Sequence, residues 1–230
     1  VIPKTGIRHV VVTELADLHP QPRRSLINLA AKYLKKMVPP WHIPGAVPLR
    51  ETLRLGAGAS HREASPGPGD LAILQYTGGT TGVSKGAMLS HGNVIANVEQ
   101  SAALFATYEF RDGAERLLLP LPLYHIYAAN ACLSMISRGC HTVLLPNPRD
   151  LASVVQAFRR YRPTGFAGLN TLFVALCNDA AFRALDFSSL KLTMSGGMAL
   201  TMAAAERWRE VTGVEIVERS EEHTSELQSQ

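Results

Sequence analysis

A stretch rich in threonine and glycine follows directly after an apolar segment at 71–76. It reads Thr-Gly-Gly-Thr-Thr-Gly-Val-Ser-Lys-Gly over residues 77–86. Closely spaced glycines let a backbone approach a bulky anion, the hydroxyls supply hydrogen bonds, and Lys85 adds a positive charge. The stretch therefore predicts a phosphate-binding loop. It is not a Walker A loop, because Ser84 precedes Lys85 and Gly86 follows it. A flexible turn is the alternative that the local sequence leaves open.

Two further places carry residues suited to ligand binding. The run Ser-Gly-Gly-Met at 195–198 ends a predicted strand and begins a predicted helix. Open α/β sheets bind ligands at such junctions, beyond the carboxyl ends of their strands, although a glycine turn needed only for packing is the alternative. His125 lies between Tyr124 and Tyr127. From the residues alone, a hydrogen-bonded core histidine is as good an interpretation as a reactive one.

These stretches belong to a larger resemblance. Residues 71–93 closely resemble the signature segment of the AMP-forming acyl-adenylate family. Further segments resemble landmarks of bacterial long-chain fatty-acid:CoA ligases, in the same order along the chain. They lie at 121–126, 147–150, 168–173, 185–190 and 195–198. The resemblance covers residues 1–218 and implies ATP, Mg²⁺ and coenzyme A as cofactors.

The resemblance implies a reaction in two steps. A fatty acid attacks the α-phosphate of ATP to give an acyl-adenylate and pyrophosphate, and the thiol of coenzyme A then displaces AMP. Charge builds up on the phosphates during the attack, so preorganised donors and a lysine would stabilise the transition state. The residues assigned to the β- and γ-phosphates are Thr77, Gly78, Gly79, Thr80, Thr81, Gly82 and Lys85.

The resemblance also assigns roles outside the phosphate loop. It gives Thr77 a contact with Mg²⁺, which would neutralise the phosphate oxygens. It makes Lys85 and His125 catalytic, with His125 near the substrate carboxylate. The glycine run, Gly196, Gly197 and Met198, would contact the adenylate and the acyl pocket.

Two residues of the 168–173 landmark receive a weaker assignment. The resemblance places Asn170 and Phe173 at the acyl channel, where they would contact the fatty acid. A core or capping role explains these two residues equally well.

The elements that position these residues follow from hydrophobic periodicity. Short apolar runs alternate with amphipathic ones, which predicts an α/β fold with mostly parallel sheets flanked by helices. With the resemblance, the chain is identified as a fragment of the large N-terminal domain of an adenylate-forming enzyme. The predicted strands are 9–12, 71–76, 116–119, 140–145, 164–167, 190–194 and 214–217. The predicted helices are 24–38, 93–107, 126–139, 151–162 and 200–211.

Composition divides the chain into four segments. Residues 1–55 would end a first N-terminal subdomain, and the Gly-, Ser- and Pro-rich segment 56–69 would be a linker. Residues 70–218 would form a truncated ATP-binding α/β subdomain. The polar tail at 219–230 resembles the in-frame translation of a sequencing-library adapter, so we expect it to be non-native. A natural disordered terminus is the alternative.

The resemblance predicts that this chain is incomplete. Related enzymes continue after Glu218 into a Gly-Tyr-Gly-x-Thr-Glu loop and end in a lid domain with a catalytic lysine, and neither is present here. We therefore expect the activity to belong to the parent enzyme and the fragment to be inactive alone.

Charge and composition limit the classes of partner that the protein is expected to bind. The net charge of +4 is spread along 230 residues without a basic block, which argues against nucleic acid. No apolar run is long enough for a membrane span and no secretory signal is visible, so we expect a cytoplasmic protein. The basic helix at 24–38 could lie on the inner membrane surface. An ordinary surface helix is the favoured interpretation, and the oligomeric state is left open.

Three cysteines complete the chemically relevant residues. Cys132, Cys140 and Cys177 lack metal-ligand spacing, so we expect reduced core thiols.

Two other functions stay open. One is an enzyme that activates acyl or aryl acids and loads them onto a carrier-protein thiol. The other is a nucleotide-binding protein that has lost catalysis.

Overall fold

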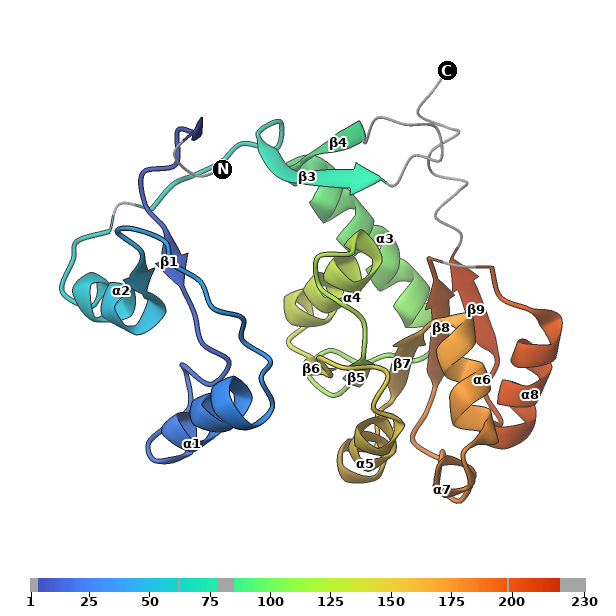
Figure 1. Ribbon diagram of the computed structural model, residues 1–230. Helices are drawn as coiled ribbons and strands as arrows, with labels where there is room; N and C mark the ends of the chain where they lie inside the picture. The colour runs from blue at the N-terminus through green and yellow to red at the C-terminus, as the bar shows by residue number, and fades with distance from the viewer. Residues whose placement is uncertain (1–3, 62, 78–84, 198, 220–230) are drawn as a thin grey trace. The chain divides into compact units, whose positions relative to one another are not determined.

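The computed structural model describes residues 4–61, 63–197 except 78–84, and 199–219 (Figure 1). The chain divides into two compact units, Val1–Ser65 and Pro66–Gln230. The division falls within the segment 56–69. The predicted non-native tail lies outside the described residues apart from Arg219.

The N-terminal unit is a small assembly of short elements. Strand β1 (Val11–Val12) pairs in parallel with β2 (Val47–Pro48). Helix α1 (Arg23–Leu29) continues without a break into the π-helix η2 (Ala30–Leu34), and α2 (Leu49–Gly56) follows β2. Helix α2 was not predicted from the sequence.

The predicted helix at 24–38 is too long by about a turn. From Ala30 the backbone widens into π geometry, where the Lys35 N–H donates to the Ala30 carbonyl at 2.8 Å. Lys36 then adopts a left-handed conformation with φ of 48°. The helix therefore ends at Leu34, before the prolines that were expected to stop it.

The C-terminal unit begins with an antiparallel hairpin. Strand β3 (Leu71–Thr77) pairs with β4 (Lys85–Ser90), and the register ends at the pair Thr77 and Lys85. Helix α3 (His91–Thr107) follows, capped reciprocally by Ser90 and Asn93. The strand β4 was missed because Lys-Gly-Ala-Met-Leu-Ser has a weak strand pattern.

A five-stranded parallel sheet forms the centre of this unit, with the order β6-β5-β7-β8-β9. Its strands are β5 (Arg116–Leu119), β6 (His141–Leu144), β7 (Gly165–Gly168), β8 (Leu192–Gly196) and β9 (Ile216–Arg219). Every pairing in it is parallel. The expectation of an α/β fold built on a parallel sheet is confirmed.

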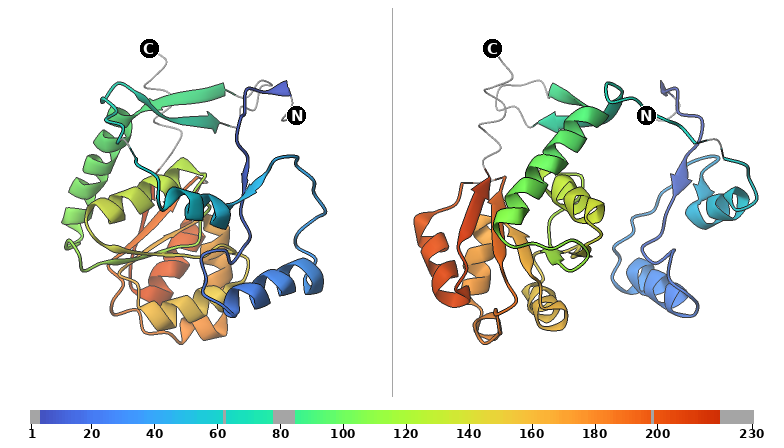
Figure 2. Two further views of the ribbon diagram at one scale, coloured as in Figure 1. Left: turned by 90° about the vertical axis from the view of Figure 1, so that its left-hand side faces the viewer. Right: turned by 180° about the vertical axis from the view of Figure 1, so that it is seen from behind.

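Helices cover both faces of the sheet (Figures 1 and 2). Helices α3 and α4 pack on one face, whereas α5, α6, α7 and α8 pack on the other. The helices after α3 are α4 (Ile126–Ser137), α5 (Leu151–Tyr161), α6 (Asn170–Asn178), α7 (Ala180–Arg183) and α8 (Met202–Thr212). Because α6 and α7 are short and show no clear alternation of apolar and polar residues, hydrophobic periodicity did not predict them.

Alternate strand residues supply the two cores. In β5, Leu117 and Leu119 face α3 and α4, whereas Leu118 faces the other helices. The core between the sheet and helices α5 to α8 contains a cluster of aromatic rings: Trp208 stacks on Phe166 at 5.5 Å between ring centroids and donates its indole N–H to Thr193 Oγ1 at 3.1 Å. The two cores therefore lie on opposite faces of the sheet.

The cysteines contribute to this interior to different degrees. Cys177 is buried, and burial raises the pKa of its thiol, whereas Cys132 and Cys140 are half-buried. All three are free of disulfides. The expectation of a reduced core thiol therefore holds best for Cys177.

Candidate functional site

The order of the strands points to one edge of the sheet. The chain leaves β5 for β6 on one side and returns to β7 on the other side of β5. Connections that diverge in this way open a crevice at the carboxyl ends of the strands, where α/β proteins bind ligands. The segments that follow β5, β7 and β8 contain three of the predicted positions, His125, Asn170 and Gly197.

His125 sits where the segment after β5 enters α4. It occupies the N-cap position of this helix, and its backbone N–H donates to the Pro122 carbonyl at 3.0 Å. Its side chain is exposed. The fold thus places His125 after the carboxyl end of β5, and its contact with a substrate carboxylate stays a prediction.

The ends of β8 and α4 meet at Gly196. A Cβ atom on this glycine would lie 3.2 Å from three ring carbons of Tyr127, which is only 8% exposed. The next residue, Gly197, has a φ of +81°, in the left-handed region that favours glycine. Packing and backbone conformation therefore explain why glycine stands at both positions. The contact of these glycines with a nucleotide stays a prediction. Met198 lies outside the described residues.

Asn170 binds the connection between β8 and α8. Its Oδ1 accepts hydrogen bonds from the Thr201 N–H at 3.0 Å and from Thr201 Oγ1 at 3.1 Å. On the other side, Glu218 Oε1 accepts from the Leu200 N–H at 3.0 Å. Asn170 therefore binds Thr201, the residue that caps α8. The contact of Asn170 with an acyl chain stays a prediction. Sequence reasoning gave Glu218 no role, because no local pattern marks this long-range bond.

Phe173 lies in the aromatic core. It is fully buried, and its ring lies 5.0 Å from that of Trp208. A Cβ atom on Gly168 would approach the Phe173 ring to 2.9 Å, so the ring depends on a glycine at that position. The structure thus gives Phe173 the core role that the sequence left open, and a contact with substrate stays a prediction.

The ends of the predicted phosphate loop form a matched pair. Thr77 and Lys85 were predicted to lie within the loop, but their backbones close the β3–β4 ladder instead. The hairpin therefore fixes the two ends of the loop side by side. The other predicted phosphate contacts lie outside the described residues: Gly78, Gly79, Thr80, Thr81 and Gly82.

The predicted contact of Thr77 with Mg²⁺ stays a prediction. Within the described ranges, no three His, Cys, Asp or Glu residues gather in a group that could hold a metal ion.

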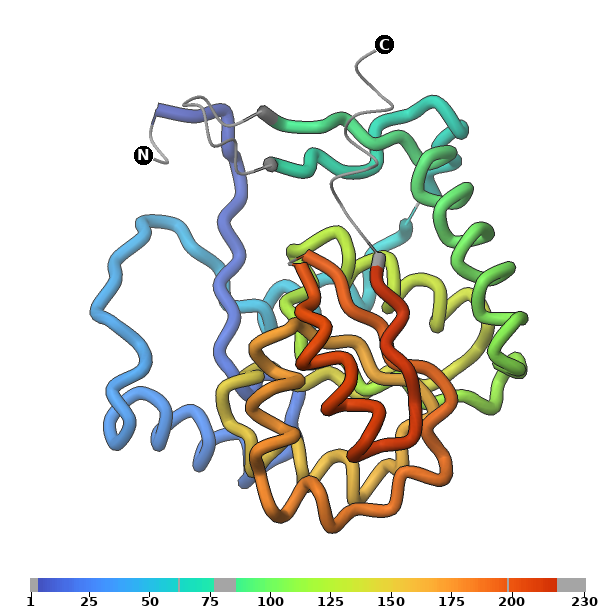
Figure 3. Tube along the Cα trace, turned by 90° about the vertical axis from the view of Figure 1, so that its right-hand side faces the viewer, coloured from blue at the N-terminus to red at the C-terminus, as the bar shows by residue number. Residues whose placement is uncertain are grey.

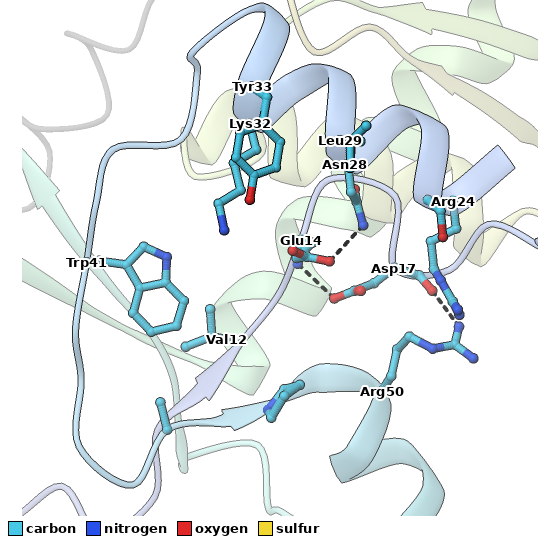
Figure 4. A pocket seen from close by; sticks show the side chains of 13 residues that line it. Val12, Glu14, Asp17, Arg24, Asn28, Leu29, Lys32, Tyr33, Trp41 and Arg50 are labelled. Atoms are coloured by element: carbon cyan, nitrogen blue, oxygen red, sulfur yellow. Dashed lines mark hydrogen bonds between the residues drawn. The ribbon is translucent and has the colours of Figure 1, made fainter. Parts of the chain in front are cut away.

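A cleft of about 610 Å³ lies in the N-terminal unit, and none of the predicted site residues lines it (Figure 4). Its polar wall is held together internally. The Glu14 carboxylate accepts from Asn28 Nδ2 at 2.8 Å, and Arg50 Nη1 donates to the Asp17 carbonyl at 2.8 Å. These bonds give Glu14 and Arg50 a structural role in the cleft.

An ion pair between a buried carboxylate and a partly exposed lysine joins the amino ends of β5 and β8, opposite the candidate site. Lys191 Nζ lies 2.8 Å from Glu115 Oε1, and Glu115 is only 2% exposed. Burial acts most strongly on this carboxyl and would raise its pKa. Hydrogen bonds from Lys191, the Arg111 N–H and Thr164 outweigh burial and hold the pKa below its usual value. The pair therefore stabilises the charged carboxylate.

The fold belongs to the class of open α/β proteins, in which helices cover both faces of a parallel sheet (Figure 3). The candidate ligand positions lie beyond the carboxyl ends of its strands. Residues 2–219 match the protein family described as AMP-binding enzyme. The chain belongs to this family. The resemblance seen in the sequence is thereby confirmed.

Curated relatives include long-chain fatty-acid–CoA ligases. Those of Haemophilus influenzae and Escherichia coli O157:H7 are each 42% identical to this chain over 95% of its length. The chain spans 39% of the length of both relatives. A more distant match, 4-coumarate–CoA ligase 3 of Arabidopsis thaliana, is 31% identical over 66% of the chain and 25% of that protein.

Solved structures share the fold. The ATP-bound MatB of Rhodopseudomonas palustris has a TM-score of 0.64 and 26% identity, and the match covers 91% of this chain and 39% of that one. An ATP-bound chimera of the same protein gives the same values. The assignment to the N-terminal domain of an adenylate-forming enzyme is thus confirmed.

None of the helices in the described part of the chain is both long enough and apolar enough to cross a membrane.

Proposed function

We propose that the protein containing this chain is a long-chain fatty-acid:CoA ligase. It would use ATP to convert a fatty acid to an acyl-adenylate and then transfer the acyl group to coenzyme A. One observation carries the proposal: 42% identity, over 95% of the chain, to curated long-chain fatty-acid–CoA ligases. The chain spans 39% of these relatives, so the activity is proposed for the full-length gene product.

The arrangement of the chain's residues fits the first step. The paired ends of β3 and β4 would hold the Thr/Gly loop around the β- and γ-phosphates, with Lys85 supplying positive charge. His125, exposed at the N-cap of α4, would lie near the fatty-acid carboxylate. Mg²⁺, when bound, would neutralise phosphate oxygens. Coenzyme A would supply the thiol for the second step.

The test is a coupled assay of the full-length gene product. We expect pyrophosphate release that requires both ATP and a long-chain fatty acid such as palmitate, and formation of acyl-CoA when coenzyme A is added. Acetate and 4-coumarate serve as short-chain and aryl controls. Pyrophosphate release with an aryl acid but not with palmitate would refute the assignment to fatty acids.

A second candidate within the family is an enzyme that activates another acyl or aryl acid, including one that loads a carrier protein. The similarity to 4-coumarate–CoA ligase 3 favours keeping the aryl alternative. The same assay separates the two, because an aryl-specific enzyme would reverse the acid preference, and a carrier-loading enzyme would form no acyl-CoA. A protein that binds nucleotide without catalysis would release no pyrophosphate with any acid.

We further propose that the enzyme works in the cytoplasm and contacts the inner membrane through the surface of α1, η2 and the segment that follows them. The exposed apolar side chains of α1 and η2 are Leu26, Leu29, Tyr33 and Leu34, and those of the following segment include Met37 and Trp41. Lys32, Lys35 and Lys36 lie among them, and residues 18–50 contain no Asp or Glu. An apolar face with flanking cations suits an anionic lipid surface.

Vesicle binding tests this contact. The full-length protein should sediment with phosphatidylglycerol vesicles and not with phosphatidylcholine vesicles. Replacing Lys32, Lys35 and Lys36 by Gln should weaken binding by roughly 3 kcal/mol, because each lysine near an anionic surface contributes about 1 kcal/mol. A triple variant that binds as tightly as the wild type would contradict the proposal. A variant with Arg207 and Arg209 in α8 replaced by Gln serves as the control.

A further inference from the structure

The turn between β8 and α8 is anchored by side chains from both neighbouring strand ends. On one side, Asn170 Oδ1 accepts from the Thr201 N–H at 3.0 Å and from Thr201 Oγ1 at 3.1 Å. On the other, Glu218 Oε1 accepts from the Leu200 N–H at 3.0 Å. Three donors of the turn are thus bound by two side chains that are distant in sequence.

The strand order explains why these two residues reach the same turn. Strand β8 lies between β7 and β9 in the sheet. Asn170 begins α6 just after β7 ends, and Glu218 is paired with Ser195 in the last rungs of the β8–β9 ladder. The turn that leaves β8 therefore lies between an acceptor from each neighbouring strand.

The anchored residues lie close in sequence to two predicted ligand positions. Gly196 ends β8, Gly197 follows it, and Thr201 is the N-cap of α8. Gly197 is in the left-handed region, which glycine adopts without the steric cost that a side chain would impose. Hydrogen bonds that fix such a loop before a ligand binds reduce the entropy that is lost on binding and so raise the affinity.

The bonds lie at the rim and not in the core. Asn170 is half-buried and Glu218 is exposed, whereas Met194 in β8 and Trp208 in α8, the elements that flank the turn, are packed in the two cores. Thr201 Oγ1 also caps α8 by accepting from the Ala204 N–H at 3.3 Å, a bond that does not involve Asn170. Loss of either anchor should therefore loosen the turn while the domain stays folded.

We infer that Asn170 and Glu218 are positioning residues that hold residues 199–201, the described part of the turn into α8, in a ligand-binding conformation. The inference rests on the proposed function, since it assumes that this turn contacts the adenylate. It assigns the two side chains an action on ATP through the turn, without direct contact. Their removal should therefore raise the KM for ATP more than it lowers kcat.

Steady-state kinetics of the full-length gene product test the inference. Asn170→Ala and Glu218→Ala should each raise the KM for ATP by about 3- to 10-fold, as loss of one or two exposed hydrogen bonds predicts. The kcat should change by less than about 2-fold if the transition state retains its own contacts. Asn170→Asp and Glu218→Gln keep the acceptor oxygen and should restore the KM.

A matched control removes a similar bond elsewhere. Asp179 Oδ1 accepts from the Phe182 N–H at 2.8 Å and caps α7, away from the turn. Asp179→Ala should leave the KM for ATP unchanged. An equal rise in KM for Asp179→Ala and Asn170→Ala would overturn the inference, because a general loss of stability would then explain both.

Hydrogen exchange separates this inference from the proposed function. A peptide covering residues 197–203 should exchange faster in Asn170→Ala and Glu218→Ala than in the wild type, whereas peptides from β7 should be unchanged. Unchanged exchange in the turn would overturn the inference even in an active enzyme. Failure of the wild type to release pyrophosphate with any acid would instead refute the proposed function, and faster exchange would still support the anchoring of the turn.

Discussion

At the scale of single residues, the glycines of β8 show how a ligand-binding pattern also serves packing. Gly196 permits the close approach of Tyr127, and Gly197 supplies a positive φ. The Gly-Gly pair could be predicted from the sequence as a special position. The ring that lies against it could not, because Tyr127 is 69 residues away and meets it only after β5, β7 and β8 have paired.

The contact with Tyr127 predicts the effect of a methyl group. Gly196→Ala would place a Cβ 3.2 Å from three ring carbons, and the buried ring would have to shift. We expect a loss of stability of about 1–3 kcal/mol, typical of overpacking, measured by chemical denaturation of the full-length protein. Gly69→Ala is the control, since no atom lies within 4 Å of the Cβ position there. Equal stabilities of the two variants would show that the contact is loose.

Asn170 and Phe173 mark the limit of prediction for individual residues. Both belong to a landmark of the resemblance, and both were open to a capping or core role. The structure binds Asn170 to Thr201 and packs Phe173 against Trp208. These partners lie more than 30 residues away, so no local pattern could identify them.

At the scale of elements, hydrophobic periodicity worked where a strand or helix is regular. The strand Arg116–Leu119 was predicted with its observed bounds, and α3, α4, α5 and α8 were each placed within about two residues. Periodicity failed at α2, α6 and α7, which are short, and at β4, whose pairing with β3 is a tertiary feature. The sequence predicted a phosphate loop that includes Thr77 and Lys85, but it did not predict that these residues pair in a hairpin.

The ion pair between Glu115 and Lys191, which precede β5 and β8, predicts how the stability of the fold depends on pH. The pKa of Glu115 is lower in the folded protein than its usual value, so its contribution to stability is complete above that usual value and is lost as the pH falls through the folded pKa. The wild type should therefore lose stability in acid more steeply than Glu115→Gln. Melting temperatures between pH 7 and pH 3 measure the difference. Parallel curves for the two proteins would contradict this assignment.

The partner of this carboxylate should matter as much as the carboxylate. Lys191→Met would leave Glu115 buried without its cation, at a cost of about 1–3 kcal/mol at neutral pH. The exposed pair Arg207 and Glu210 is a matched control, because Glu210→Gln should cost less than about 1 kcal/mol. Urea denaturation of both variants makes the comparison, and equal losses would show that burial of Glu115 is unimportant.

At the scale of the whole molecule, the fold class and the family followed from the sequence, and the arrangement of the site followed only in part. Alternating apolar runs indicated a parallel α/β sheet, and motif order indicated the family. The strand order, with β5 between β6 and β7, depends on long-range pairing that periodicity does not encode. That order is what brings His125, Asn170 and Gly197 to one edge.

The central claim is that the Thr/Gly loop between β3 and β4 binds the triphosphate of ATP during activation of a fatty acid. ATP–pyrophosphate exchange by the full-length gene product, with palmitate and without coenzyme A, tests it most directly. We expect palmitate-dependent exchange that Lys85→Ala slows by about 10²- to 10³-fold without changing the melting temperature, and that Lys85→Arg slows less. Exchange that is as fast in Lys85→Ala as in the wild type would contradict the claim.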